Sequence, residues 1–222
     1  MPNQHTLQFL KNLEENNNRE WFQANRKDYE IAKQEFEHFC QEVLNGLCAF
    51  QEDLLNTRVK DCIFRINRDI RFSKDKSPYK NHFSAAFGPG GRNSGRIDFY
   101  LQVESGNRSL LGGGMWEPTA AHLASFRQEI DYNPEHLKGI IFNETFKSYY
   151  NQVSAQKVKL VPKGYTANHP DIELLKCKTL FYNHQYPDTE VLSPNFAKEV
   201  VKGCFILKPY LDYLNELFYN NA

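Results

Sequence analysis

The sequence lacks the short motifs that identify most enzyme classes. It has no GxGxxG or GxxxxGK[ST] phosphate loop, no HExxH or HxH spacing, no GxSxG nucleophile elbow and no CxxC pair. Its five cysteines are odd in number and far apart, which fits buried, reduced thiols in a cytoplasmic protein. The seven histidines show no metal-ligand spacing either. We therefore predict no metal site and no cofactor.

A long apolar run and a net charge are also missing. The N-terminus lacks the basic start and apolar stretch of a secretion signal, and no later run approaches a membrane span. The 27 Lys+Arg residues balance 27 Asp+Glu, which argues against a general polyanion binder. In contrast, 17 Phe and 12 Tyr supply ample material for a core. These features predict a folded cytoplasmic protein with no membrane partner.

Hydrophobic periodicity predicts an α+β fold. Apolar residues recur at helical spacing over 18–45, and Asn17 with Glu20 resembles a capping box before this helix. The period changes to two in the central third, which predicts strands at 63–72, 82–87 and 96–104 and from Ser109 onward. Helical patterns return in the last third of the chain, each opened by a proline: Pro118, Pro134, Pro170 and Pro194. Pro209 is expected to kink or divide the last helix. We predict one α+β domain over 1–222, in which an antiparallel sheet from the central third packs against N-terminal and C-terminal helices.

The most informative segment is RINRDIRFSKDKSPYK, residues 65–80. It holds six basic and two acidic residues, a local excess that the neutral chain as a whole does not explain. Arginine forks onto carboxylate and phosphate oxygens with two parallel hydrogen bonds. The predicted ligand-binding residues are Arg65, Arg68, Arg71, Lys76, Tyr79 and Lys80, with Asp69 as the candidate base or arginine-orienting group.

Two interpretations of this segment stay open. In the first, the cations form a cradle for the phosphate or carboxylate group of a small molecule. In the second, Asp69 and Asp75 neutralise the arginines in a structural network that pins the turn to the sheet. The run Gly112-Gly113-Gly114 could bind an anion before a helix, but a bulge or a close approach by another backbone is favoured.

The basic segment has the pattern RxxRDxRFxxxKxPY, and three further pieces accompany it: NNNREWF (16–22), GGGMWEP (112–118) and PKGYTANHPDIELLK (162–176). Together these pieces resemble the uncharacterised family "domain of unknown function 2461", which is found mainly in bacteria. Lys163 stands where the family is expected to have arginine, and Trp116 where tyrosine is more usual. The resemblance implies a single family-length domain and brings no established activity.

The leading functional hypothesis is therefore a domain that binds, or acts on, an anionic and phosphorylated small molecule through an Arg/Lys cradle. The alternative is a non-catalytic interaction module that binds protein or nucleic acid through the same basic patch, with nucleic acid the less favoured partner. Phosphate contacts would then make the affinity fall steeply with salt. The sequence does not decide between an enzyme and a binding protein, and it leaves the oligomeric state open.

Overall fold

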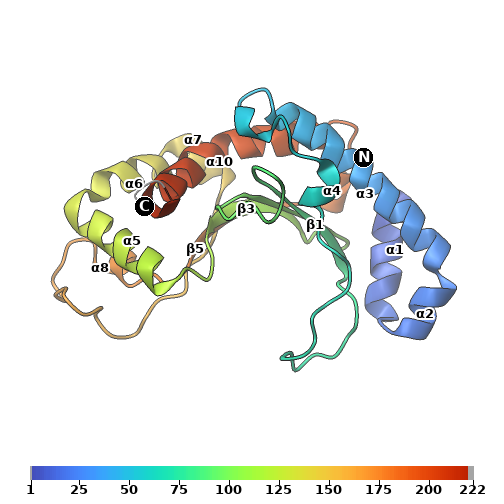
Figure 1. Ribbon diagram of the computed structural model, residues 1–222, viewed down its shortest axis with the longest axis horizontal. Helices are drawn as coiled ribbons and strands as arrows, with labels where there is room; N and C mark the ends of the chain where they lie inside the picture. The colour runs from blue at the N-terminus through green and yellow to red at the C-terminus, as the bar shows by residue number, and fades with distance from the viewer. Residues whose placement is uncertain (1, 220–222) are drawn as a thin grey trace. The chain divides into compact units, whose positions relative to one another are not determined.

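The computed structural model describes residues 2–219 as a mixture of helices and one sheet (Figure 1). In chain order the elements are α1 (Gln4–Glu15), α2 (Arg19–Ala24), α3 (Arg26–Leu47), η1 (Glu52–Leu54), α4 (Val59–Cys62), β1 (His82–Phe87), β2 (Phe99–Glu104), β3 (Ser109–Met115), α5 (Ala120–Tyr132), α6 (Pro134–Ile141), α7 (Glu144–Tyr149), β4 (Gln152–Ser154), α8 (Ile172–Leu175), β5 (Leu180–Tyr186), α9 (Asp188–Val191) and α10 (Phe196–Tyr219). None of these described helices has both the length and the apolar character needed to cross a membrane.

The sheet has five antiparallel strands in the order β1-β2-β3-β5-β4 and is flanked by helices, which confirms the predicted α+β class. Strand β1 occupies the predicted range, and β2 begins three residues later than predicted. Strands β4 and β5, which pair antiparallel with Val153 opposite Tyr182, were not predicted. They are short or irregular in polarity, so the period-two signal is weak there.

The contacts of the chain fall into two compact units. Unit 1 contains the chain up to Ser94 together with 100–111 and 185–204. Unit 2 contains 95–99, 112–184 and the chain from Phe205 onward. The single domain expected over 1–222 stays a prediction.

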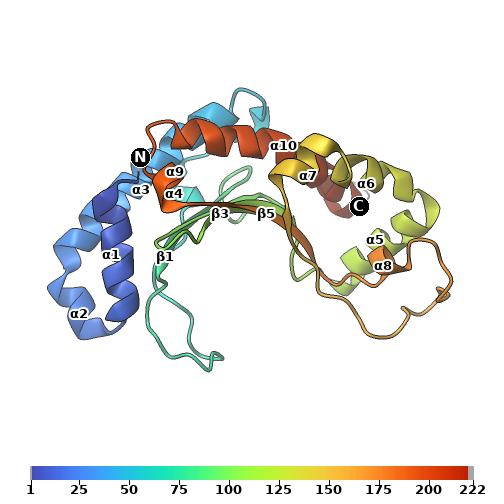
Figure 2. The same cartoon turned by 180° about the vertical axis from the view of Figure 1, so that it is seen from behind.

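Unit 1 is held together by an aromatic core between α3, β1 and the first part of α10. The Phe36 ring stacks on Phe83 of β1 at 5.3 Å, and the Phe39 ring stacks on Phe196 of α10 at 5.0 Å. All four rings are buried, and Figure 2 shows the first part of α10 running alongside α3. Burial of such rings is the main favourable term that fixes β1 in place.

The long helix predicted over 18–45 is interrupted at Asn25. Residues 19–24 form α2 and residues 26–47 form α3, and the Asn25 side chain donates to the Trp21 carbonyl at 2.8 Å. The capping residue is Asn18, whose side chain accepts from the Trp21 N–H at 2.9 Å, so the capping box predicted at Asn17 is wrong. Asparagine side chains compete for backbone groups in this way and favour helix ends over helix interiors.

The strand predicted over 63–72 is also wrong in extent. Its first half is extended and pairs with the chain before and within β1, through bridges Ile63↔Ala85 and Asn67↔Tyr79. Beyond Arg68 the chain leaves the pairing as a loop, the teal segment that extends away from β1 in Figure 1. Asp69 and Asp75 each accept a hydrogen bond from the backbone N–H two residues on, at 3.2 and 2.9 Å. Such local turns offer the backbone an alternative to the sheet ladder.

In unit 2, the glycines of β3 permit a close approach by β5. A Cβ at Gly112 would lie 2.5 Å from the Tyr182 carbonyl oxygen, and Gly114 has φ +137°. This confirms the close approach by another backbone that the sequence favoured over an anion loop. Pro134 occupies the first turn of α6, whereas Pro209 lies inside α10 without dividing it.

Candidate functional site

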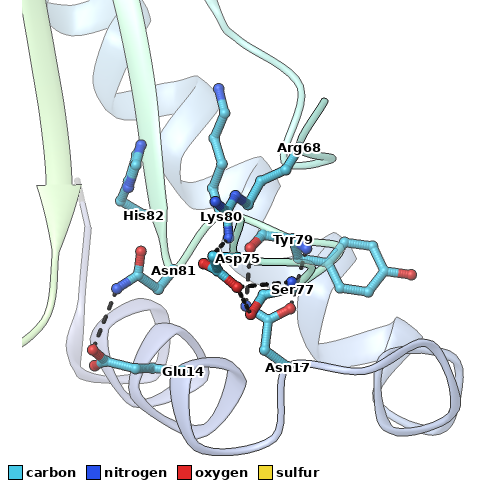
Figure 3. Close-up of a pocket in the computed structure, with 9 residues that line it drawn as sticks. All are labelled: Glu14, Asn17, Arg68, Asp75, Ser77, Tyr79, Lys80, Asn81 and His82. Carbon is cyan, nitrogen blue, oxygen red and sulfur yellow. Dashed lines mark hydrogen bonds and ion pairs between the residues drawn. The ribbon is translucent and has the colours of Figure 1, made fainter. Parts of the chain in front are cut away.

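The candidate site is a pocket of about 420 Å³ in unit 1, beside the first residues of β1 (Figure 3). It is built by the end of α1 and Asn17 two residues beyond it, by the loop that follows the extended segment, and by the chain that leads into β1. Its lining residues are Glu14, Asn17, Arg68, Asp75, Ser77, Tyr79, Lys80, Asn81 and His82. Three of the predicted ligand-binding residues, Arg68, Tyr79 and Lys80, are therefore brought together.

Lys80 is the cation of this pocket without an acidic partner. Its side chain is half-buried, and no carboxylate among residues 2–219 lies within ion-pair distance of its ammonium group. The ammonium lies 5.2 Å from the centre of the Phe64 ring. Burial, followed by repulsion from Arg65, lowers the pKa of Lys80 below its usual value. Its positive charge is therefore poorly compensated by the protein itself.

Arg68, in contrast, has a counter-charge. Its guanidinium pairs with Asp75, and Asp75 accepts further hydrogen bonds from the Ser77 N–H at 2.9 Å and the Ser77 hydroxyl at 2.7 Å. These hydrogen bonds from Ser77, with that from Arg68, hold the pKa of Asp75 well below its ordinary value. Arg68 therefore keeps a fixed place at the pocket wall, with its guanidinium drawn toward Asp75 (Figure 3).

Tyr79 contributes its backbone to the pocket, while its ring points away from it (Figure 3). The ring is buried and stacks on Phe22 of α2 at 4.0 Å. The Asn17 side chain donates to the Tyr79 carbonyl at 2.9 Å and accepts from the Tyr79 N–H at 3.1 Å. This reciprocal pair joins two segments that are 62 residues apart in the sequence and fixes the backbone next to Lys80.

His82 lines the pocket and lies near Glu104, and neither residue was among the predicted site residues. His82 Nδ1 lies 3.9 Å from a Glu104 carboxylate oxygen, and Glu104 also accepts from Asn81 at 2.9 Å. Burial, then the charges of Lys80 and Arg68, lower the pKa of His82 to about 4, so its imidazole is neutral at pH 7. The sequence placed His82 at the start of a predicted strand, but its nearness to Glu104 depends on the pairing of β1 with β2.

The remaining predicted residues lie outside this pocket. Arg71 forms hydrogen bonds with both carboxylate oxygens of Asp69, and the Lys76 ammonium donates to the Ile70 carbonyl at 3.0 Å. Arg71, through its side chain and then its backbone N–H, lowers the pKa of Asp69 to about 2. Arg65 lines a different cavity. The two acids of the segment thus pair with Arg68 and Arg71, as the structural-network interpretation requires. In the described part of the chain, Lys80 and Arg65 form no ion pair with a carboxylate.

A second polar cluster, in unit 2, is structural. His169 Nε2 lies 3.1 Å from Asp131, and His169 Nδ1 accepts from the Asp171 N–H at 3.0 Å. Both ring nitrogens are occupied, so the imidazole anchors the loop and has no free nitrogen for chemistry. Within residues 2–219 no group of three His, Cys, Asp or Glu side chains could hold a metal ion, and the expected absence of a metal site stays a prediction.

The fold and this pocket define an α+β protein with a cation-containing cavity at the start of a strand. The chain belongs to the family described as conserved hypothetical protein (DUF2461), whose profile matches residues 5–213. The match covers nearly the whole chain and confirms the family resemblance. No curated protein and no solved structure matches the chain.

Proposed function

We propose that the pocket around Lys80 binds the anionic group of a small molecule, with phosphate the preferred chemistry. The observation that carries this proposal is the half-buried ammonium of Lys80, which has no carboxylate partner among residues 2–219. Placing a cation in a partly desolvated site costs free energy unless an opposite charge compensates it. An oxyanion bound beside Lys80 would supply that charge, and the Arg68 guanidinium at the same wall would add charge-assisted hydrogen bonds.

The size of the pocket supports a small ligand. A volume of about 420 Å³ falls within the range of ordinary small-molecule sites. Its acids, Asp75 and Glu14, are occupied by Arg68 and by Arg108, respectively, so they repel an anion less than free carboxylates would. Of the cations predicted for the cradle, this proposal keeps Lys80 and Arg68, whereas Arg65, Arg71 and Lys76 do not line the pocket.

Binding is the part of the hypothesis that we carry forward, not catalysis by Asp69. A carboxylate whose pKa is about 2 is a weak base at pH 7. The imidazole of His82, at the wall of the same pocket, has a pKa of about 4 and is also a weak base at pH 7, so it offers a bound molecule a neutral hydrogen-bonding group. We also propose a cytoplasmic location in a bacterial cell, which the five free cysteines support as far as the compartment is concerned.

The test is a thermal-shift titration with inorganic phosphate and with common phosphorylated metabolites. A ligand at 100 times its Kd stabilises the folded state by about 2.7 kcal/mol, which raises Tm measurably. Lys80→Ala should abolish the rise. Lys74→Ala, which removes the same charge from the exposed part of the loop, should preserve it. Absence of any rise in the wild type, or an equal rise in Lys80→Ala, would exclude the proposal.

One observation favours the interaction module as the second candidate. The side chain of Phe72 is 95% exposed at the loop, and the Arg71 guanidinium lies 5.8 Å from its ring centre. An exposed aromatic ring beside cations can stack on an unpaired base. The corresponding test is the anisotropy of a labelled single-stranded oligonucleotide: steeply salt-dependent binding that Phe72→Ala weakens, without any response to phosphometabolites, would favour this candidate.

A further inference from the structure

A second cavity, also in unit 1, has the composition of a site for an amphiphilic anion. Its volume is about 380 Å³, and four of its lining residues are cations: Lys33, Lys60, Arg65 and Arg92. The only acid in its lining is Glu37. These cations come from α3, from α4, from the start of the basic segment and from the loop after β1, so the fold gathers them from four separate parts of the sequence.

The cations of this cavity are largely uncompensated. Among residues 2–219, no carboxylate lies within ion-pair distance of Lys33, Lys60 or Arg65. Arg92 is held in position, because its guanidinium donates to the Asp61 carbonyl at 2.8 Å. Surface charges are usually mixed in sign, so four cations against one acid around a single cavity indicate an anionic occupant.

The floor of the same cavity is apolar. It is formed by Ile63, Phe64, Ile66 and Phe83, and the last two are buried at 4% and 3% exposure. Phe83 belongs to the aromatic core through its contact with Phe36, so its ring is held in place. A purely ionic ligand such as inorganic phosphate would leave this floor exposed to water, whereas an acyl or aryl body would cover it.

We propose that this cavity binds a small amphiphilic anion: an aryl or acyl body on the Phe64–Phe83 floor, with a carboxylate, phosphate or sulfonate group among Lys33, Arg65 and Lys60. This cavity shares no lining residue with the Lys80 pocket, although the two are neighbours, because the Lys80 ammonium lies 5.2 Å from the centre of the Phe64 ring. The proposal therefore does not rest on the function proposed for that pocket.

The test uses 1-anilinonaphthalene-8-sulfonate, which carries an aromatic body and one sulfonate, as the fluorescent probe on the native full chain. We expect saturable 1:1 binding with a blue-shifted emission, and displacement by decanoate or phenyl phosphate. Lys33→Ala and Arg65→Ala should each weaken the probe by about tenfold or more, the loss of one charge-assisted contact. Melting curves without the probe establish that each variant is folded.

Lys27→Ala is the matched control, because Lys27 lies on the same helix, is exposed and does not line the cavity. It should keep the wild-type affinity. No saturable binding, binding that Lys33→Ala and Arg65→Ala leave unchanged, or an equal loss in Lys27→Ala would each overturn the proposal. The phosphate response of Lys80→Ala is measured separately, so the two binding proposals fail independently.

Discussion

Three consecutive asparagines, residues 16–18, should respond very differently to the same substitution by alanine. Asn16 donates to the Asn12 carbonyl from an exposed position, Asn18 caps α2, and Asn17 forms the reciprocal pair with the Tyr79 backbone. An exposed hydrogen bond is easily replaced by water, so Asn16→Ala should cost less than about 0.5 kcal/mol. Asn18→Ala should cost about 1 kcal/mol, the usual value of an N-cap.

Asn17→Ala should be the most damaging of the three. It removes two hydrogen bonds at once and leaves a part-buried N–H and carbonyl of Tyr79 without their partner. With about 1 kcal/mol for each bond and a further penalty for the unsatisfied backbone groups, the expected loss is about 2–3 kcal/mol. At an m-value of about 2–3 kcal/mol per M, this lowers the urea midpoint by about 1 M.

The assay is urea denaturation followed by Trp21 fluorescence, in a Trp116→Phe background that leaves the tryptophan of unit 1 as the only reporter. Trp116 is more than half exposed, so the background change should be mild. If the three alanine variants had equal midpoints, Asn17 would not be joining the two segments. The argument that it fixes the backbone beside Lys80 would then fail.

Three further predictions concern backbone strain, protonation and the basic loop. In thermal melts, Gly114→Ala should destabilise the protein by about 2 kcal/mol or more, because the new Cβ would lie 2.4 Å from a carbonyl oxygen. Gly139→Ala, which has open space around it in α6, should stabilise the protein by about 0.5–1 kcal/mol. Equal effects of the two substitutions would refute the close approach at Gly114. The pKa of His82 is about 4 in the folded chain and 6.5 for the free side chain, so the unfolded chain binds a proton more readily than the folded chain. The contribution of His82 to stability is therefore complete above pH 6.5 and is lost as the pH falls toward 4. An NMR titration that found the imidazole half-protonated near pH 6.5 would contradict this. Asp69→Asn should leave the urea midpoint at pH 7 unchanged, because Asp69 and Arg71 are both exposed; a clear loss would show that the pair stabilises the loop.

The last prediction changes what the Asp69 substitution can decide. From the sequence alone, a large loss of stability would have indicated a structural role for Asp69 within a buried network. Because the residue is exposed, a small effect is now expected whether or not it has a function. Ligand binding by Lys80→Ala and Lys33→Ala variants is therefore the more informative measurement.

The sequence by itself determined the class of the fold and the features that depend on local periodicity. The change to a period of two predicted β1 at 82–87, and the helical pattern after Pro194 predicted the last helix. The charge excess of the basic segment was also visible, because it is a property of local composition. Hydrophobic periodicity and composition are set by residues that are close together in the sequence, so they can be used without knowing which other segments pack against them.

Only the tertiary structure decided which cations share a cavity. The local turns of Asp69 and Asp75 end the extended segment at Arg68 and so separate Arg71 from Lys80. Asn17 then fixes the backbone of Tyr79, 62 residues away and next to Lys80. Arg65 joins Lys33 and Arg92 in the other cavity. Such pairings depend on where the chain folds back on itself. Packing and hydrogen bonding between residues far apart in the sequence select the partners, so no local pattern in one sequence predicts them.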